Sequence, residues 1–245
     1  MTRNIRLKIA YDGTDFCGWQ KQENDRTVQG EIEAALEKIH GKHVAVTGCG
    51  RTDSGVHAAG QTANFFTELD SLPSGRFSLA LNSLLPHDVR ILDSAEADTG
   101  FHARFSAVSR TYRYQFICRT LFPHERLYNI FLHRFPDIKL LNSYGRLLLG
   151  ETDCSVFAGS GDISNSKNRY IYNSIFFTEG EKLIFEIRAN AFLRKMVRSV
   201  AGTFLHYEET CTEPERLRDI IACGKRSGAG PTLPPQGLFL WNVEY

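Results

Sequence analysis

Predicted strands that follow one another without an intervening helix constrain the fold of this chain more than any other feature. Residues 170–177 and 182–189 have β-strand patterns and are separated by only four residues, and residues 43–47 and 61–66 flank a turn-rich segment. Parallel neighbours need a crossover connection of about a dozen residues or more, so these pairs predict antiparallel hairpins. A doubly wound parallel sheet is therefore disfavoured, and the sequence predicts an α+β fold.

The other predicted elements divide into two successive α+β halves. Residues 5–11 alternate as a half-buried strand does, and a helix is expected between Thr27, its N-cap, and Gly41. Also expected are a short helix after Pro73, strands at 89–97 and 109–118, helices at 138–149, 191–206 and 214–223, and a C-terminal strand. We place the domain boundary so that residues 1–103 form the first half and residues 104–245 the second.

Charge and cysteine content exclude several classes of protein. Lys and Arg number 29 against 28 Asp and Glu, so the chain is not a polyelectrolyte. The N-terminus lacks the apolar block of a secretory signal, and no apolar run approaches the ~18 residues of a membrane span. Six cysteines without a Cys-x-x-Cys pair are expected to be reduced, mostly buried thiols. We therefore expect a cytoplasmic protein with no membrane association and no metal.

The strongest candidate for chemistry is the segment from Gly48 to His57, in which three glycines surround Arg51 and Asp53. Glycines allow a backbone to approach a ligand closely. A phosphate-binding P-loop is excluded, because Val56 and His57 stand where that motif needs Lys and Ser or Thr. Two alternatives remain open from the residues alone: Asp53 is a functional carboxylate, or it forms a structural Asx-turn. His57 is likewise either an acid/base group or a structural ring.

Residues 101–119 combine arginines with aromatic side chains and contain no acidic residue. Arginine for phosphates and aromatic rings for bases is the composition that suits single-stranded or looped RNA. Strand alternation places Tyr112, Tyr114 and Phe116 on one face and Arg113 on the other. The alternative is a core strand with a solvated basic face.

The predicted helix at 191–206 carries Arg194 and Arg198, which are four residues apart and would share a face. Such a pair is usually solvated. Apolar neighbours surround Arg198, so we expect it to point into a cleft and to need an anionic partner. Asp53 would be that partner if the two halves pack face to face.

Seven segments together resemble the tRNA pseudouridine synthase A family in the order in which that family carries them. They are Tyr11-Asp-Gly-Thr-Asp-Phe-Cys-Gly-Trp-Gln20, Thr27-Val-Gln-Gly30, Gly50-Arg-Thr-Asp-Ser-Gly-Val-His-Ala58, Phe101-His-Ala-Arg-Phe105, Arg110-Thr-Tyr-Arg-Tyr114, Asn190-Ala-Phe-Leu-Arg-Lys-Met-Val-Arg198 and Gly237-Leu-Phe-Leu240. The resemblance runs from residue 5 to 245. Two departures are Ser54, where alanine is usual, and residues 150–157, which lack the usual Asp-Phe.

The resemblance implies two similar α+β halves around a central mixed sheet flanked by helices, with an RNA-binding cleft between the halves. It also implies a homodimer without metal or organic cofactor. The expected substrate is a uridine in the anticodon arm of tRNA, at positions 38 to 40. A pseudouridine synthase with another RNA target, or a non-catalytic RNA-binding module, is the alternative.

The resemblance also assigns roles to individual residues. It makes Asp53 the catalytic nucleophile, has Tyr112 contact the target uracil, pairs Arg198 with Asp53, and has Leu238 close the pocket. Arg51 is expected near the displaced base. The expected contacts to the RNA backbone are Phe101, His102, Arg104, Phe105, Lys167 and Arg169.

Overall fold

The computed structural model describes residues 2–245, which form two compact units. The first contains the chain up to Val108 together with Phe239–Tyr245, and the second is Ser109–Leu238. The predicted boundary at residues 103 and 104 lies five residues before this division. The last strand returns to the first unit because Phe239 and Leu240 pair with His57 and Ala58 in parallel.

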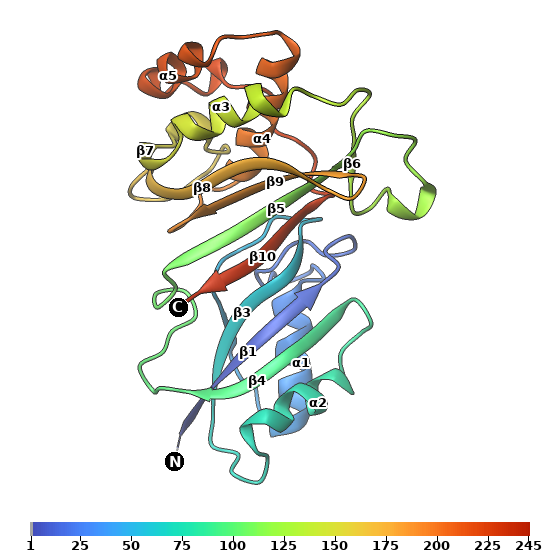
Figure 1. The fold of residues 1–245 in the computed structure, drawn as a ribbon. Helices are drawn as coiled ribbons and strands as arrows, with labels where there is room; N and C mark the ends of the chain where they lie inside the picture. The colour runs from blue at the N-terminus through green and yellow to red at the C-terminus, as the bar shows by residue number, and fades with distance from the viewer. Residues whose placement is uncertain (1) are drawn as a thin grey trace. The chain divides into compact units, whose positions relative to one another are not determined.

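The first unit is an α+β unit with a mixed sheet (Figure 1). Its elements are β1 (Arg3–Tyr11), α1 (Val28–His40), β2 (Thr47–Gly48), β3 (His57–Thr67), a 3₁₀ turn at Ser74–Arg76, α2 (Phe77–Asn82), β4 (Val89–Ala97) and most of β10 (Leu238–Glu244). The strands are ordered β4-β1-β3-β10, with β1 antiparallel to both neighbours and β2 paired to β3. The predicted antiparallel pairing is thus confirmed, and β10 adds one parallel pair.

Local sequence signals set the ends of α1 as predicted. The Thr27 side chain accepts a hydrogen bond from the backbone of Gly30, and Gly41 ends the helix in the left-handed conformation at φ 67°. The buried face of α1 consists of residues at helical spacing, including Ile32 and Leu36.

The prediction of a strand at 43–47 was wrong for most of that segment, because only Thr47–Gly48 forms a strand. The backbone N–H of Val46 donates to the Glu33 carboxylate at 3.1 Å, and its carbonyl accepts from the Gln29 side chain at 3.0 Å. Two helix side chains therefore take the hydrogen bonds that a strand partner would make, so the segment is tied to α1 and not to the sheet.

The second unit is also α+β, with its helices on one side of a mainly antiparallel sheet (Figure 1). Its elements are β5 (Ser109–Ile117), β6 (Ile130–Phe131), α3 (Ile138–Leu147), β7 (Gly150–Asp153), β8 (Asn168–Glu179), β9 (Lys182–Ala189), α4 (Met196–Glu209) and α5 (Pro214–Cys223), with 3₁₀ turns at Pro123–Glu125, Ser155–Phe157 and Arg226–Gly228. The sheet order is β5-β9-β8-β7, and β6 pairs in parallel with β5. The core under the helices is aromatic, with Tyr114, Phe116, Phe176 and Phe185 fully buried. Residues 150–157 pack normally despite their unusual sequence, since Val156 and Phe157 are buried.

The helix predicted at 191–206 begins five residues later, at Met196, and continues to Glu209. The backbone N–H of Arg194 donates to the Asp162 carboxylate at 2.7 Å, and Lys195 has a left-handed backbone at φ 59°. Both features are incompatible with a continuing helix. Arg194 and Arg198 therefore do not share a helix face, and the prediction that they do was wrong.

Three further observations concern residues 2–245. No helix in this range is long and apolar enough to cross a membrane. No group of three or more His, Cys, Asp or Glu side chains in the range could hold a metal ion. All six cysteines are free thiols, but the prediction that most of them are buried was wrong. Only Cys49 and Cys154 are buried, whereas Cys17, Cys211 and Cys223 are exposed.

Candidate active site

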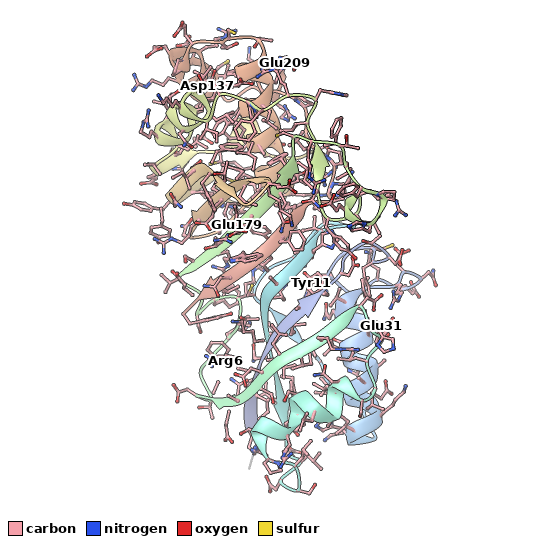
Figure 2. The ribbon with its side chains drawn as sticks, turned by 45° about the vertical axis from the view of Figure 1, so that its right-hand side comes forward. Arg6, Tyr11, Glu31, Asp137, Glu179 and Glu209 are labelled. Carbon is pink, nitrogen blue, oxygen red and sulfur yellow. The ribbon has the colours of Figure 1, made fainter. Side chains whose placement is uncertain are left out.

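The glycine-rich segment after β2 is held against the end of β1 by close backbone packing. A Cβ on Gly13 would lie 2.1 Å from the carbonyl oxygen of Val56, so only glycine permits this approach. The backbone N–H of Trp19 donates to the carbonyl of Thr52 at 3.2 Å. The hydroxyls of Tyr11 and Thr52 are hydrogen bonded at 2.8 Å, where β1 ends (Figure 2). Burial raises the pKa of Tyr11, which keeps this phenol neutral.

A tight turn presents Asp53. The carbonyl of Asp53 accepts from the backbone N–H of Val56 at 3.1 Å, and Gly55 between them has φ 77°, a conformation that favours glycine. Ser54 Oγ and the N–H of Gly55 both donate to the carbonyl of Phe16, at 3.1 and 3.3 Å. Backbone groups and the Ser54 hydroxyl thus contribute to closing this turn. The Asp53 side chain is half-buried.

A buried glutamine fixes the start of the same segment. Gln61 on β3 has no exposed surface, and its amide nitrogen donates to the carbonyl of Gly50 at 3.0 Å. Its amide oxygen accepts from Cys49 Sγ at 2.8 Å. Gln61 is a site residue that the sequence pattern does not mark, because Thr62 and Asn64 in the same predicted strand are also polar. Its burial requires partners for its amide, and only the fold shows which groups they are.

His57 is buried and packed in this geometry. Its side chain is 1% exposed, and Nδ1 accepts from the backbone N–H of Gly13 at 3.0 Å and lies 3.1 Å from Asp12 Oδ1. The ring stacks on Phe239 with a centroid separation of 4.6 Å. Of the two roles left open by the sequence, these contacts favour the structural one.

The segment 98–106 is held by two buried asparagines. Asn64 on β3 donates from Nδ2 to Asn4 Oδ1 at 2.9 Å and accepts from the backbone N–H of Ala103 at 2.9 Å. Asn4 on β1 donates to the carbonyls of Asp98 and Phe101 at 2.9 and 2.8 Å. Sequence reasoning missed both asparagines. Asn4 precedes the predicted strand 5–11 and falls in step with its polar residues Arg6 and Lys8, so the pattern does not mark it as buried. Together they fix the backbone of the whole segment.

Four predicted RNA contacts lie on this fixed segment. Phe101 packs against Tyr245, with ring centroids 4.9 Å apart. His102 Nδ1 accepts from the backbone N–H groups of Arg104 and Phe105, at 3.2 and 3.3 Å. Phe105 is 76% exposed, with the Arg104 guanidinium 5.5 Å from its ring centroid. An exposed ring with a guanidinium beside it, on a rigid backbone, is suited to contact RNA.

In the second unit, Tyr112 lies on the buried face of β5. It shares that face with Tyr114 and Phe116, whereas Arg113 pairs on the other face with Glu186 at 2.8 Å. Tyr112 is 9% exposed, and its ring meets Phe192 edge to face at 5.0 Å.

The chain between α5 and β10 contacts Arg198 and leads into Leu238, two other predicted site residues of this unit. Arg198, in the first turn of α4, donates from Nε to the carbonyl of Leu233 at 2.7 Å. The Tyr114 hydroxyl donates to the carbonyl of Pro234, and the backbone N–H of Gln115 to that of Gly237 at 2.8 Å. These contacts attach residues 233–237 to both α4 and β5. Leu238 follows directly and is 4% exposed.

Lys167 and Arg169 differ in how they are held. Burial acts to raise the pKa of Asp162, but the Lys167 ammonium and backbone N–H donors outweigh it and hold that pKa well below its usual range. The charge of Lys167 is thus offset by an ion pair. The Arg169 guanidinium donates to the carbonyls of Ser166 and Asn168, at 2.9 and 2.6 Å. Carbonyl oxygens are neutral, so these two hydrogen bonds do not cancel the positive charge of Arg169.

Comparison with known proteins shows which family this chain resembles in sequence. The sequence profile of the family described as tRNA pseudouridine synthase matches residues 8–106 and 146–245. The tRNA pseudouridine synthase A of Treponema denticola is 53% identical, with 99% of this chain and 93% of that protein covered. The proteins of the same name from Treponema pallidum and Caldicellulosiruptor saccharolyticus are 51% and 45% identical, covering 94% and 99% of this chain and 84% and 100% of theirs.

Proposed function

We infer that this chain, which belongs to the tRNA pseudouridine synthase family, is an isomerase that converts uridine to pseudouridine in tRNA. The observation that carries this function is the loop from Gly50 to Gly55, which the fold holds by backbone contacts and which presents the Asp53 carboxylate. We further propose that the target lies in the anticodon arm, at positions 38 to 40.

The reaction makes limited but specific demands on the protein. The N1–C1′ bond of uridine breaks, the uracil turns, and a C5–C1′ bond forms. The proton leaves C5 and N1 gains one, so nothing is oxidised or hydrolysed. We assign the Asp53 carboxylate to the reacting sugar, where it either attacks C1′ or removes a proton to give a glycal.

The uridine must first leave its base stack, at a cost of about a few kcal/mol. We propose that Tyr112 contacts the freed uracil, that Leu238 closes the pocket over it, and that Arg51 enters the space near the displaced base. The segment 101–105 and Arg169 would hold the RNA backbone, with Lys167 as a weaker contact because Asp162 offsets its charge. The pairing of Arg198 with Asp53 stays a prediction.

Location and oligomeric state are also proposals. We propose a cytoplasmic location, because the proposed substrate is tRNA. A homodimer is expected from the family resemblance, and sedimentation at micromolar concentration tests it. A monomer under those conditions would remove that part of the proposal.

The decisive experiment is incubation with unmodified tRNA followed by mapping of pseudouridine at each position. Asp53→Asn should keep the melting temperature and the affinity for tRNA, because the side chain keeps its shape, while turnover disappears. Asp70→Asn, an exposed position in the β3–α2 connection, is the matched control and should stay active. Multiple turnover by Asp53→Asn would overturn the assignment. Release of free uracil would instead indicate a glycosidase, and tRNA binding without product would indicate an RNA-binding module.

A further inference from the structure

Arg51, two residues before Asp53, is held by one side chain. Its Nε donates to Gln20 Oε1 at 3.1 Å, and the rest of the described chain provides no other hydrogen bond to its guanidinium. Both Nη groups are therefore available to a ligand. A guanidinium fork of this kind suits a phosphate or the edge of a base.

We propose that Gln20, anchored through Gln29 on the carboxylate of Glu33, is a positioning residue that aims Arg51 at the RNA. This inference rests on the proposed function and deepens it. It assigns a role to three side chains that the reaction chemistry itself does not use.

Gln29 determines which way the amide of Gln20 points. The Nε2 of Gln29 donates to Glu33 Oε1 at 2.9 Å and to the carbonyl of Val46 at 3.0 Å, so two acceptors fix the orientation of its amide. Its Oε1 then faces outward and accepts from Gln20 Nε2 at 2.8 Å and from the backbone N–H of Lys21 at 3.1 Å. Gln20 must present its nitrogen to Gln29, which leaves its oxygen for Arg51.

Glu33 supplies the fixed end of this chain of contacts. It is 3% exposed and accepts from Lys21 Nζ at 3.0 Å, from His43 Nε2 at 3.2 Å and from the backbone N–H of Val46 at 3.1 Å. Burial acts to raise the pKa of Glu33, but these donors and Gln29 lower it below its usual value. An ionised carboxylate only accepts hydrogen bonds, so it keeps Gln29 in the one orientation that serves Gln20.

Backbone contacts tie the same parts together. Trp19, next to Gln20, donates to the carbonyl of Thr52 and accepts from the N–H of Gln29 at 3.0 Å. The chain on either side of the Gln20 to Arg51 contact is therefore fixed, and the side-chain contact sets the direction of the guanidinium. A neutral amide oxygen holds the arginine without cancelling its charge, which a carboxylate would do.

A double-mutant cycle tests this role. Gln20→Ala, Arg51→Ala and the double variant are compared by single-turnover rates of pseudouridine formation at saturating enzyme. Gln20 is exposed, so its loss should leave the melting temperature unchanged. Gln22→Ala is the matched control, since Gln22 lies in the same connection and donates only to the carbonyl of Cys17.

We expect Gln20→Ala to lower the single-turnover rate roughly 3- to 10-fold, as the release of one immobilised side chain would. In the Arg51→Ala background the same change should have less than about a twofold effect, because the guanidinium that Gln20 orients is absent. Gln22→Ala should match the wild type.

Two results would overturn the inference while leaving the proposed function standing. One is a wild-type rate for Gln20→Ala, and the other is an equal loss from Gln20→Ala with and without Arg51. A wild-type chain that forms no pseudouridine in tRNA, or an active Asp53→Asn variant, would instead refute the function or its catalytic residue, and this inference would fall with the function.

Discussion

Removing the side chain of Asn64 should both destabilise the first unit and release the segment 98–106. In Asn64→Ala, two buried groups lose their partner: Asn4 Oδ1 and the backbone N–H of Ala103, each now at 2.9 Å from the Asn64 amide. Asn64 is 2% exposed and Asn4 is 1% exposed, so water does not readily replace the amide. The change therefore leaves one acceptor and one donor unsatisfied.

The size of the effect follows from these two groups. Each buried polar group left unpaired costs about 1–3 kcal/mol, so the free energy of unfolding should fall by about 2–6 kcal/mol. Against a typical total of about 5–15 kcal/mol the variant should still fold. Releasing Arg104 and Phe105 adds an ordering cost to RNA binding of about 1–3 kcal/mol, or roughly 5- to 150-fold in affinity.

Urea denaturation and binding to a tRNA anticodon stem-loop measure the two effects. Asn82→Ala is the matched control, because Asn82 also bridges two backbone groups, the N–H and the carbonyl of Ile91, both at 2.8 Å. It joins α2 to β4 and does not touch the segment 98–106. The control should lose stability but bind RNA as the wild type does, at a temperature where both variants are folded.

Three outcomes would refute this reasoning. A stability loss below about 0.5 kcal/mol for Asn64→Ala would mean that its hydrogen bonds are replaced at little cost. Equal RNA affinity for Asn64→Ala and Asn82→Ala would mean that the segment does not contact RNA or does not depend on this anchor. Weak binding by both would show that the loss reflects general destabilisation.

Two further predictions concern single side chains. Tyr112→Ala should lose roughly 1–3 kcal/mol of binding free energy for tRNA if the ring stacks on the flipped uracil, whereas Tyr112→Phe should bind nearly normally; equal affinities of the two variants would exclude stacking. The pKa of Glu33 is lower in the folded protein than in the unfolded chain, where a carboxyl titrates near about pH 4. Ionised Glu33 therefore stabilises the fold above that pH, and this contribution is lost as pH falls through the pKa of Glu33 in the folded protein. Urea titrations from neutral pH to pH ~3 should therefore show a smaller acid-side loss of stability in Glu33→Gln, and parallel pH profiles would contradict the assignment.

Much of the local structure follows from the sequence. Thr27 and Gly41 bound α1, Pro214 and Gly224 bound α5, and the alternation in 109–118 places Tyr112 on the buried face. These features depend on interactions within a few residues, and the sequence displays such interactions directly. The candidate loop was also identified from its residues, since glycines around Arg51 and Asp53 are visible without a fold.

Contacts between distant residues decided the rest. The segment 43–46 is not a strand because Glu33 and Gln29 take its hydrogen bonds, and α4 starts late because Asp162, 32 residues away, takes the N–H of Arg194. Periodicity in a short window carries no information on such partners.

The sequence by itself determined the α+β class, the ends of α1 and α5 and the chemical groups of the site. Only the tertiary structure decided that His57 is a packed ring, that Asn4 and Asn64 anchor the segment 98–106, and that Gln20 holds Arg51. The physical reason is that a side chain's own chemistry is local, whereas the partner that satisfies a buried donor or acceptor is selected by the packing of the whole unit.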